Sequence, residues 1–123
     1  MATDFMISPY HRPGTLAAAT TALGEAGINI EGQCAYVCAG QGMYHVLVND
    51  AELARRALLN AGFDIRTERR VVVTSVANKP GATGALLRRV ADLGVDIDLV
   101  YVTAEGDLVL GGEDPDAIAR ALG

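Results

Sequence analysis

The feature that most constrains this chain is an internal repeat that covers almost its whole length. A basic residue, a proline and a glycine stand at positions 12–14 and again at 79–81, each time before apolar residues at helical spacing. The two turn glycines lie 67 residues apart, and so do Gly27 and Gly94, which close the two segments. A unit of this length is too long for a solenoid repeat, so the pattern predicts a small domain copied in tandem.

Periodic apolar patterns predict the elements of the first copy, because alternation is typical of strands and helical spacing is typical of helices. The predicted order is strand, helix, strand, strand, helix, strand, over residues 5–8, 15–26, 28–36, 43–49, 51–61 and 63–68. Gly27 and Gly62 are suited to end the helices, since a helix stop often needs the left-handed conformation that glycine tolerates. Asp50 is suited to cap the start of the second helix.

The second copy repeats this order except at its end. The predicted elements are strand, helix, strand, strand and helix, over residues 71–76, 82–93, 95–102, 108–110 and 115–123. The fold class is therefore α+β, with two ferredoxin-like βαββαβ modules in tandem over 1–68 and 69–123, the second lacking its last strand. Because an open sheet edge invites pairing with another chain, we expect a strand of the neighbouring module or of a second chain to cover it, and we predict a homodimer.

Composition excludes several classes of protein. Of the 123 residues, 50% are hydrophobic and 20% are charged, which is typical of a chain that folds around a core. The net charge of −5 disfavours nucleic acid as a partner, since phosphates attract basic surfaces. No apolar run reaches the roughly 20 residues that span a bilayer, and residues 1–4 do not begin a signal peptide. We therefore expect no membrane partner and a cytoplasmic location with reduced cysteines.

The paired turns and the segments 26–30 and 93–97, Ala-Gly-Ile-Asn-Ile and Leu-Gly-Val-Asp-Ile, resemble the ACT domain family over essentially the whole chain. Members of this family are regulatory modules with a ferredoxin-like fold that bind small ligands, most often amino acids, at interfaces between modules. The resemblance implies a stand-alone tandem ACT protein that senses a small molecule, without catalysis and without a cofactor. Two features depart from the family pattern, the missing last strand and the lack of a catalytic domain in the sequence.

In the family, ligand contacts come from the loop after the first strand, the start of the first helix and the facing second strand. The resemblance implies the matching positions of this chain as ligand-binding residues. These are Arg12, Pro13, Gly14, Thr15 and Asn29 in the first copy, and Asn78, Lys79, Pro80, Gly81, Ala82 and Asp96 in the second.

A physical argument that does not depend on the resemblance also favours these turns as binding sites. A helix start exposes N–H groups without partners and about half a positive charge, which suits a carboxylate. Arg12 or Lys79 adds a formal charge, and Asn29 or Asp96 can accept hydrogen bonds from an ammonium group. Because a carboxylate suits that role better than an amide, the second copy is predicted to be the better equipped. The alternative is an ordinary Pro-Gly turn whose basic residue points into water.

Other groups favour neither a catalytic site nor a metal site. Cys34, Cys38 and His45 offer three metal ligands, but their spacing is not that of a zinc finger, so we expect the cysteines to be core residues. His11 precedes the first turn, and no residue in the sequence forms an evident catalytic relay with it.

Three functions remain open. The first is a regulatory protein that binds an amino acid or a similar small carboxylate, which favours the assembly in which both halves of the site meet. The second is an interaction subunit that docks an enzyme of amino-acid metabolism or a regulator without binding a ligand. The third is a small enzyme that uses His11 or His45. We predict the first.

Overall fold

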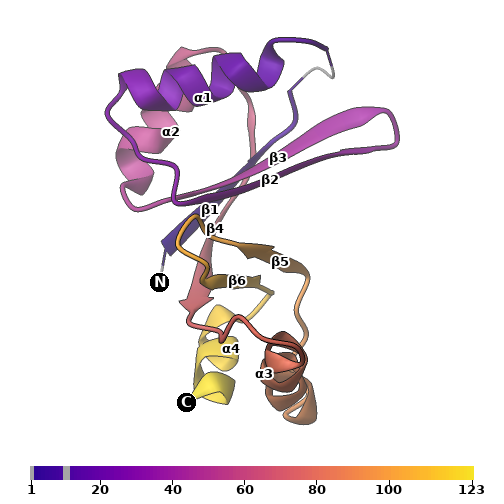
Figure 1. Ribbon diagram of the computed structural model, residues 1–123. Helices are drawn as coiled ribbons and strands as arrows, with labels where there is room; N and C mark the ends of the chain where they lie inside the picture. The colour runs from indigo at the N-terminus through magenta and orange to yellow at the C-terminus, as the bar shows by residue number, and fades with distance from the viewer. Residues whose placement is uncertain (1, 10–11) are drawn as a thin grey trace. The chain divides into compact units, whose positions relative to one another are not determined.

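The computed structural model describes residues 2–9 and 12–123 (Figure 1). They divide into a first unit, Ala2–Arg69, and a second unit, Arg70–Gly123. The described residues form six strands and four helices in the predicted βαββαβ-type order, so the α+β, ferredoxin-like fold class is confirmed. None of the helices in the described part of the chain has the length and apolar character needed to cross a membrane.

The first unit has three complete strands, two helices and the start of a fourth strand. These elements are β1 (Ala2–Ile7), α1 (Thr15–Glu25), β2 (Gly32–Cys38), β3 (Gln41–Val48), α2 (Ala51–Asn60) and β4 (Ile65–Thr74). The strand order is β2-β3-β1-β4, and β3 pairs antiparallel with both β1 and β2. In this register Phe5 lies opposite Val46, and Cys34 lies opposite His45.

One core lies between this sheet and its two helices, which Figure 1 shows over the same face. Alternate residues of β1 and β3, such as Phe5 and Val46, are fully buried. They share a cluster with Leu23 of α1 and Leu58 of α2, which are also fully buried. Each such side chain contributes roughly 1.5–3 kcal/mol through its removal from water. This core fixes the helices on the sheet and so fixes where each helix begins.

The direction of the strands decides which loops meet in the first unit. Because β1 and β2 both run antiparallel to β3, the loop after β1, the tip of the β2–β3 hairpin and the loop between α2 and β4 lie at one end. Figure 1 shows the hairpin tip and the start of α1 on the same side. The loops between α1 and β2 and between β3 and α2 lie at the opposite end.

The second unit holds the end of β4, followed by α3 (Ala82–Asp92), β5 (Leu99–Val102), β6 (Leu108–Gly111) and α4 (Pro115–Leu122). Its strand order is β4-β6-β5. Val72, Leu110 and Ile118 belong to its core cluster. Arg89 of α3 donates a hydrogen bond of 2.6 Å to the backbone carbonyl of Leu122, one of the carbonyl groups that a helix end leaves without a partner. The last element of the described second unit is α4.

The helices agree with their predicted limits to within one residue, but most of the strands do not. The strands predicted over 63–68 and 71–76 form one strand, β4, because the charged residues between them continue the alternation without glycine or proline. β2 and β5 begin at Gly32 and Leu99 rather than at residues 28 and 95. β1 and β3 begin earlier than predicted, at Ala2 and Gln41 rather than at residues 5 and 43.

Burial explains the late start of β2 and β5. Ile28 is buried in the core of the first unit, and Ile97 packs against the core of the second. The backbone reaches the sheet just before each strand. There the backbone N–H of Glu31 donates a hydrogen bond of 2.9 Å to the carbonyl of Leu47, and the N–H of Asp98 donates one of 2.9 Å to the carbonyl of Gly111. The alternating apolar residues at these places therefore report contact with the core rather than strand pairing.

Candidate ligand-binding site

The helices α1 and α3 begin without a side-chain cap. Their N-terminal positions are Gly14, with φ 91° and ψ −12°, and Gly81, with φ 85° and ψ −11°. This left-handed conformation is unfavourable for residues with a Cβ, although no atom lies within 4 Å of where a Cβ would stand at either glycine. Glycine is therefore required at both turns by the backbone conformation and not by a lack of space.

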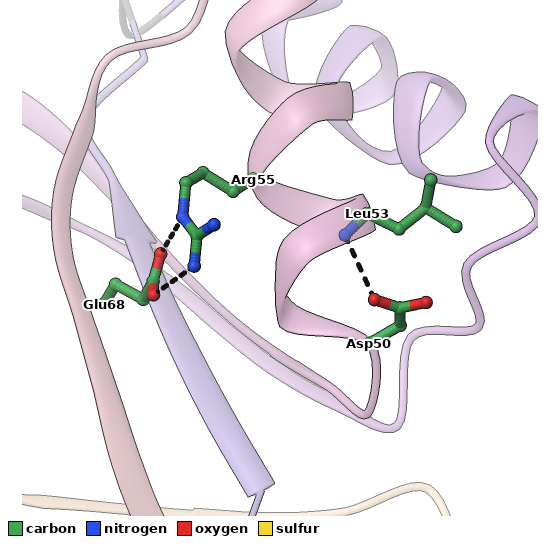
Figure 2. A network of polar contacts seen from close by, with 4 residues as sticks. All are labelled: Asp50, Leu53, Arg55 and Glu68. Atoms are coloured by element: carbon green, nitrogen blue, oxygen red, sulfur yellow. Dashed lines mark hydrogen bonds and ion pairs between the residues drawn. The ribbon is translucent and has the colours of Figure 1, made fainter.

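The helices α2 and α4 begin differently. Asp50 accepts a hydrogen bond of 3.1 Å from the backbone N–H of Leu53, as Figure 2 shows. Asp114 accepts one of 3.0 Å from the N–H of Ala117. These carboxylates satisfy first-turn N–H groups of the kind that α1 and α3 leave to water or a ligand. The starts of α1 and α3 therefore keep a partial positive charge that is open to an anion.

Two cavities flank the first turn. The four residues predicted there line both cavities, namely Arg12, Pro13, Gly14 and Thr15. The first, here named the charged cavity, has a volume of ≈ 790 Å³ and is completed by the hairpin tip at 40–41, the segment 61–64 and Arg66. The second, the apolar cavity, has a volume of ≈ 580 Å³ and is completed by the start of α1 and by residues of β2 and β3, among them Tyr36 and Val37.

Among the described residues, three charged side chains line the charged cavity. Arg12 comes from the turn, and Asp64 and Arg66 come from the segment that enters β4. Because side chains alternate along an extended chain, residues two apart project to the same side. In the described part of the chain, neither Asp64 nor Arg66 has a side-chain hydrogen bond or an ion pair with another residue. The cavity thus presents a carboxylate and a guanidinium that have no partner among these residues.

The next acidic residue of β4 is paired. Glu68 accepts hydrogen bonds of 2.6 Å from both Nε and Nη2 of Arg55 in α2, as Figure 2 shows. These hydrogen bonds hold the pKa of Glu68 below its usual range and raise the pKa of Arg55. Glu68 is therefore held by α2, and Arg66 lacks the neighbouring carboxylate of its own strand.

Asn29 lies at the other end of α1 from the turn. It is exposed and lines a third cavity, of ≈ 190 Å³, together with Glu31, Asn49 and Asp50. The 11 residues of α1 place about 16 Å between the start of the helix and its end. Within the first unit, Asn29 therefore does not meet the Arg12–Thr15 turn.

The second copy separates its predicted residues in the same way. At the start of α3, the exposed residues are Asn78, Lys79, Pro80 and Gly81, and Ala82 is half-buried. Asp96 is exposed beyond the end of α3, where its carbonyl oxygen would lie 2.7 Å from a Cβ built on Gly112. The described part of the second unit ends with α4 and a final glycine, so it holds no counterpart of the segment 61–66 that completes the charged cavity.

The residues considered for metal binding or catalysis lie elsewhere. His45 is buried, and its Nδ1 atom lies 3.0 Å from a carboxylate oxygen of Asp4. Cys34 is half-buried and Cys38 is exposed, because β2 is the edge strand of the first unit, so the prediction of a core residue is wrong for Cys38. In the described part of the chain, no three His, Cys, Asp or Glu residues are grouped so that they could hold a metal ion. His11 lies outside the described residues.

Sequence reasoning missed Asp64 and Arg66. They stand in an alternating segment that predicts an ordinary strand, and nothing local marks them. The signal that points to them is topological, because a ferredoxin-like βαββαβ module brings the loop before the strand 63–68 to the same end as the turn 12–15. A functional residue of this kind is found only after the loops have been assigned to the ends of the unit.

Several solved structures have the same fold. A protein from Bacteroides thetaiotaomicron is 27% identical, with a TM-score of 0.87, and the match covers 98% of this chain and 85% of that one. The ligand-free regulatory subunit of aspartate kinase from Thermus thermophilus is 22% identical, with a TM-score of 0.68 and coverage of 98% and 88%. Aspartate kinase from Clostridium acetobutylicum is 12% identical, with a TM-score of 0.63, and the match covers 98% of this chain and 32% of the kinase.

These matches establish the fold of the chain. No protein-family model matches it, and no curated protein does. The regulatory subunits of aspartate kinase among the structural neighbours are ACT-domain proteins, so the resemblance predicted from the paired turns is confirmed at the level of the fold.

Proposed function

We propose that this chain is a non-catalytic regulatory protein, built of two ACT-like modules over 1–68 and 69–123, that binds an amino acid or a related small carboxylate at the Arg12–Thr15 turn. The observation that carries the proposal is the uncapped start of α1, which lies beside Arg12 and between two cavities. The fold shared with the regulatory subunit of aspartate kinase is a second support.

The chemistry of the turn suits a carboxylate. By helix geometry, the N–H groups of Leu16 and Ala17 have no partner inside α1 and point toward its start. The guanidinium of Arg12 adds charged donors beside them. Gly14 permits close approach to the backbone, and Pro13 fixes the turn that presents these groups. A carboxylate bound here would complete the helix end as Asp50 completes the start of α2.

The proposal includes a homodimer. Within the first unit the turn lies at the opposite end of α1 from Asn29, and in the second unit Gly81 is separated from Asp96 in the same way. A site that contains both sets of residues therefore needs a second module, and we propose that a second copy of the chain supplies it. A ligand that bridges two chains would favour the dimer, because it binds the assembled site more tightly than either separate half. An enzyme or regulator partner would then bind the ligand-filled dimer. The turn 78–82 with Asp96 is proposed as a second site of the same kind.

The experiment is a thermal-shift and calorimetric titration of the full chain with each of the common amino acids. A ligand that binds only the folded protein raises the Tm. Arg12→Glu is expected to remove the shift, because it places an anion where the carboxylate would bind. Arg56→Glu, on the exposed face of α2 and outside both cavities, is the matched control and is expected to keep the shift. The absence of a shift and of heat with every amino acid would overturn the proposal.

A second candidate function is an interaction subunit that docks an enzyme of amino-acid metabolism without binding a ligand. The edge strand β2 favours it, because Tyr36 and Val37 are 48% and 51% exposed there. Apolar side chains beside an unpaired strand edge invite another protein. Tyr36→Glu would then abolish the complex while the amino-acid screen stayed silent. Under either candidate we place the chain in the cytoplasm, where its free thiols stay reduced.

A further inference from the structure

We infer that the charged cavity is built for an α-amino acid whose side chain ends in an anionic group, a carboxylate or a phosphate. This inference rests on the proposed function, in which the Arg12–Thr15 turn binds an amino acid. It adds the chemical class of the ligand, which is set by the charges that line the cavity.

Size alone selects little at this site. The volume of ≈ 790 Å³ lies within the roughly 300–1,000 Å³ that is usual for small-molecule pockets, so every common amino acid fits. Discrimination between amino acids therefore depends on the polar groups that converge on the cavity.

The start of α1, Asp64 and Arg66 each match a complementary charged group on the ligand. The α-carboxylate takes the start of α1 beside Arg12, and Asp64 accepts hydrogen bonds from the α-ammonium group. Arg66 is then a second guanidinium in the same cavity, and an amino acid with a neutral side chain has no anion left for it. A second anion on the ligand matches Arg66, because a planar guanidinium binds a carboxylate or a phosphate through two parallel hydrogen bonds.

No described residue of the protein neutralises Asp64 or Arg66. Asp64 and Arg66 stand two residues apart, yet they form no ion pair with each other or with any other described residue. The carboxylate of Glu68, the next on the strand, is occupied by two hydrogen bonds of 2.6 Å from Arg55. The charges of Asp64 and Arg66 are therefore available to a ligand of opposite pattern.

The apolar cavity on the other side of the turn provides the contrast. Among the described residues that line it, Arg12 alone is charged, and Leu16, Tyr36 and Val37 supply apolar surface. An amino acid with an apolar side chain would be matched by that cavity instead. The preference of the protein for one class of ligand therefore reports which cavity is used.

The test is isothermal titration of the full chain with L-aspartate, L-glutamate and O-phospho-L-serine, against L-asparagine, L-glutamine and L-serine at one ionic strength. The acidic ligands are expected to bind at least about tenfold tighter, because hydrogen bonds between charged groups are stronger than those to neutral amides. Arg66→Gln should bring this ratio to about one, since the second anion then loses its charged partner. Arg56→Gln, outside the cavity, should leave the ratio unchanged.

A second arm tests the ammonium position with succinate, which has two carboxylates and no ammonium group. Asp64→Asn should weaken the binding of L-aspartate and leave the binding of succinate unchanged or tighter, because the substitution removes a carboxylate that attracts the ammonium group and repels an anion. Weakening of both ligands to the same extent would contradict this placement.

The possible results separate the inference from the proposed function. Equal affinities for L-aspartate and L-asparagine, or a ratio that survives Arg66→Gln, overturn the inference and leave the proposed function standing. Tighter binding of L-leucine or L-phenylalanine than of L-aspartate overturns it as well and assigns the ligand to the apolar cavity. Failure of every amino acid to bind overturns the proposed function. A preference for L-glutamate or for O-phospho-L-serine supports the inference and identifies the anion.

Discussion

The two copies of the repeat share a turn and differ in what surrounds it. Gly14 and Gly81 have nearly the same φ, 91° and 85°, and neither helix that follows has a side-chain cap. In the first copy the turn shares one end of its unit with the hairpin tip and the segment 61–66, and the charged cavity lies among them. The second copy has no counterpart of that segment among its described residues. A repeated motif therefore predicts a backbone conformation, whereas a binding site depends on the segments that the topology adds to it.

The largest expected effect tests whether the shorter copy has a core of its own. Leu58 and Ile118 each lie in the second helix of their copy, and both are fully buried. Leu58→Ala and Ile118→Ala are each expected to lower the free energy of unfolding by about 2–5 kcal/mol, because both leave a cavity in a packed core. Urea unfolding followed by circular dichroism measures the change. A loss below about 1 kcal/mol for Ile118→Ala would mean that the second copy contributes little to folding.

The next effect compares the two turns as ligand sites. Arg12→Glu is expected to weaken the tightest amino-acid ligand about 100-fold, which is about 2.7 kcal/mol. Lys79→Glu is expected to change the affinity by less than about threefold if binding depends on the charged cavity of the first copy. Calorimetric titration of both variants gives the two ratios. Equal losses would show that the second turn binds as well as the first, whereas the sequence alone predicted the second copy to be the better equipped.

A smaller effect tests whether the turn backbones are equivalent. Gly14→Ala and Gly81→Ala are each expected to lower the free energy of unfolding by about 1–2 kcal/mol, because alanine is disfavoured in the left-handed region. The matched controls are Gly24→Ala and Gly84→Ala within α1 and α3, where φ is not positive and no atom would meet the new methyl group. These should raise stability by about 0.5–1 kcal/mol. Opposite signs in the two pairs would confirm that conformation is what requires glycine at the turns.

The smallest effect distinguishes the surface ion pairs of the two units. In the first unit, Nη2 of Arg55 lies 2.6 Å from Oε2 of Glu68. In the second, Nη2 of Arg70 lies 3.4 Å from Oδ2 of Asp116. Because folding lowers the pKa of Glu68 from its usual 4.5, the stability that this pair adds is present above that pH and is lost as the pH falls through the lower, folded value. Glu68→Gln should therefore flatten the dependence of unfolding free energy on pH between about pH 3 and 5. Asp116→Asn should change the free energy of unfolding at pH 7 less than Glu68→Gln does, because its ion pair is longer, and equal changes would contradict the distinction.

The elements that were predicted well are those fixed by local chemistry. Glycines in the left-handed conformation end α1 and α2, at Gly27 and Gly62, and Asp50 and Asp114 cap α2 and α4. Each of these signals acts within a few residues of the chain, so the sequence contains it in full. The limits of β2, β4 and β5 were less accurate, because a strand begins and ends where its partner does and a single sequence does not show the partner.

The residues of the candidate site also separate into those that local chemistry predicts and those that only the topology brings together. The Arg12–Thr15 turn was predictable, since proline and glycine act on their own backbone. Asp64 and Arg66 were not predictable in this way. They lie near the turn only because the directions of three strands and a helix bring their segment to the same end of the unit. Asn29 was assigned to the turn by resemblance, yet the length of α1 places it at the other end of the unit. Whether Asn29 completes a site on a second chain stays a prediction.

The exposed thiol at the end of β2 has a practical consequence. Cys38 stands two and three residues before Gly40 and Gln41, which line the charged cavity, whereas the other cysteine, Cys34, is half-buried. A maleimide dye would react first at the more accessible sulfur, without any engineering of the chain. The unaltered protein thus carries an attachment point for a fluorescent reporter at the rim of the pocket whose occupant is sought.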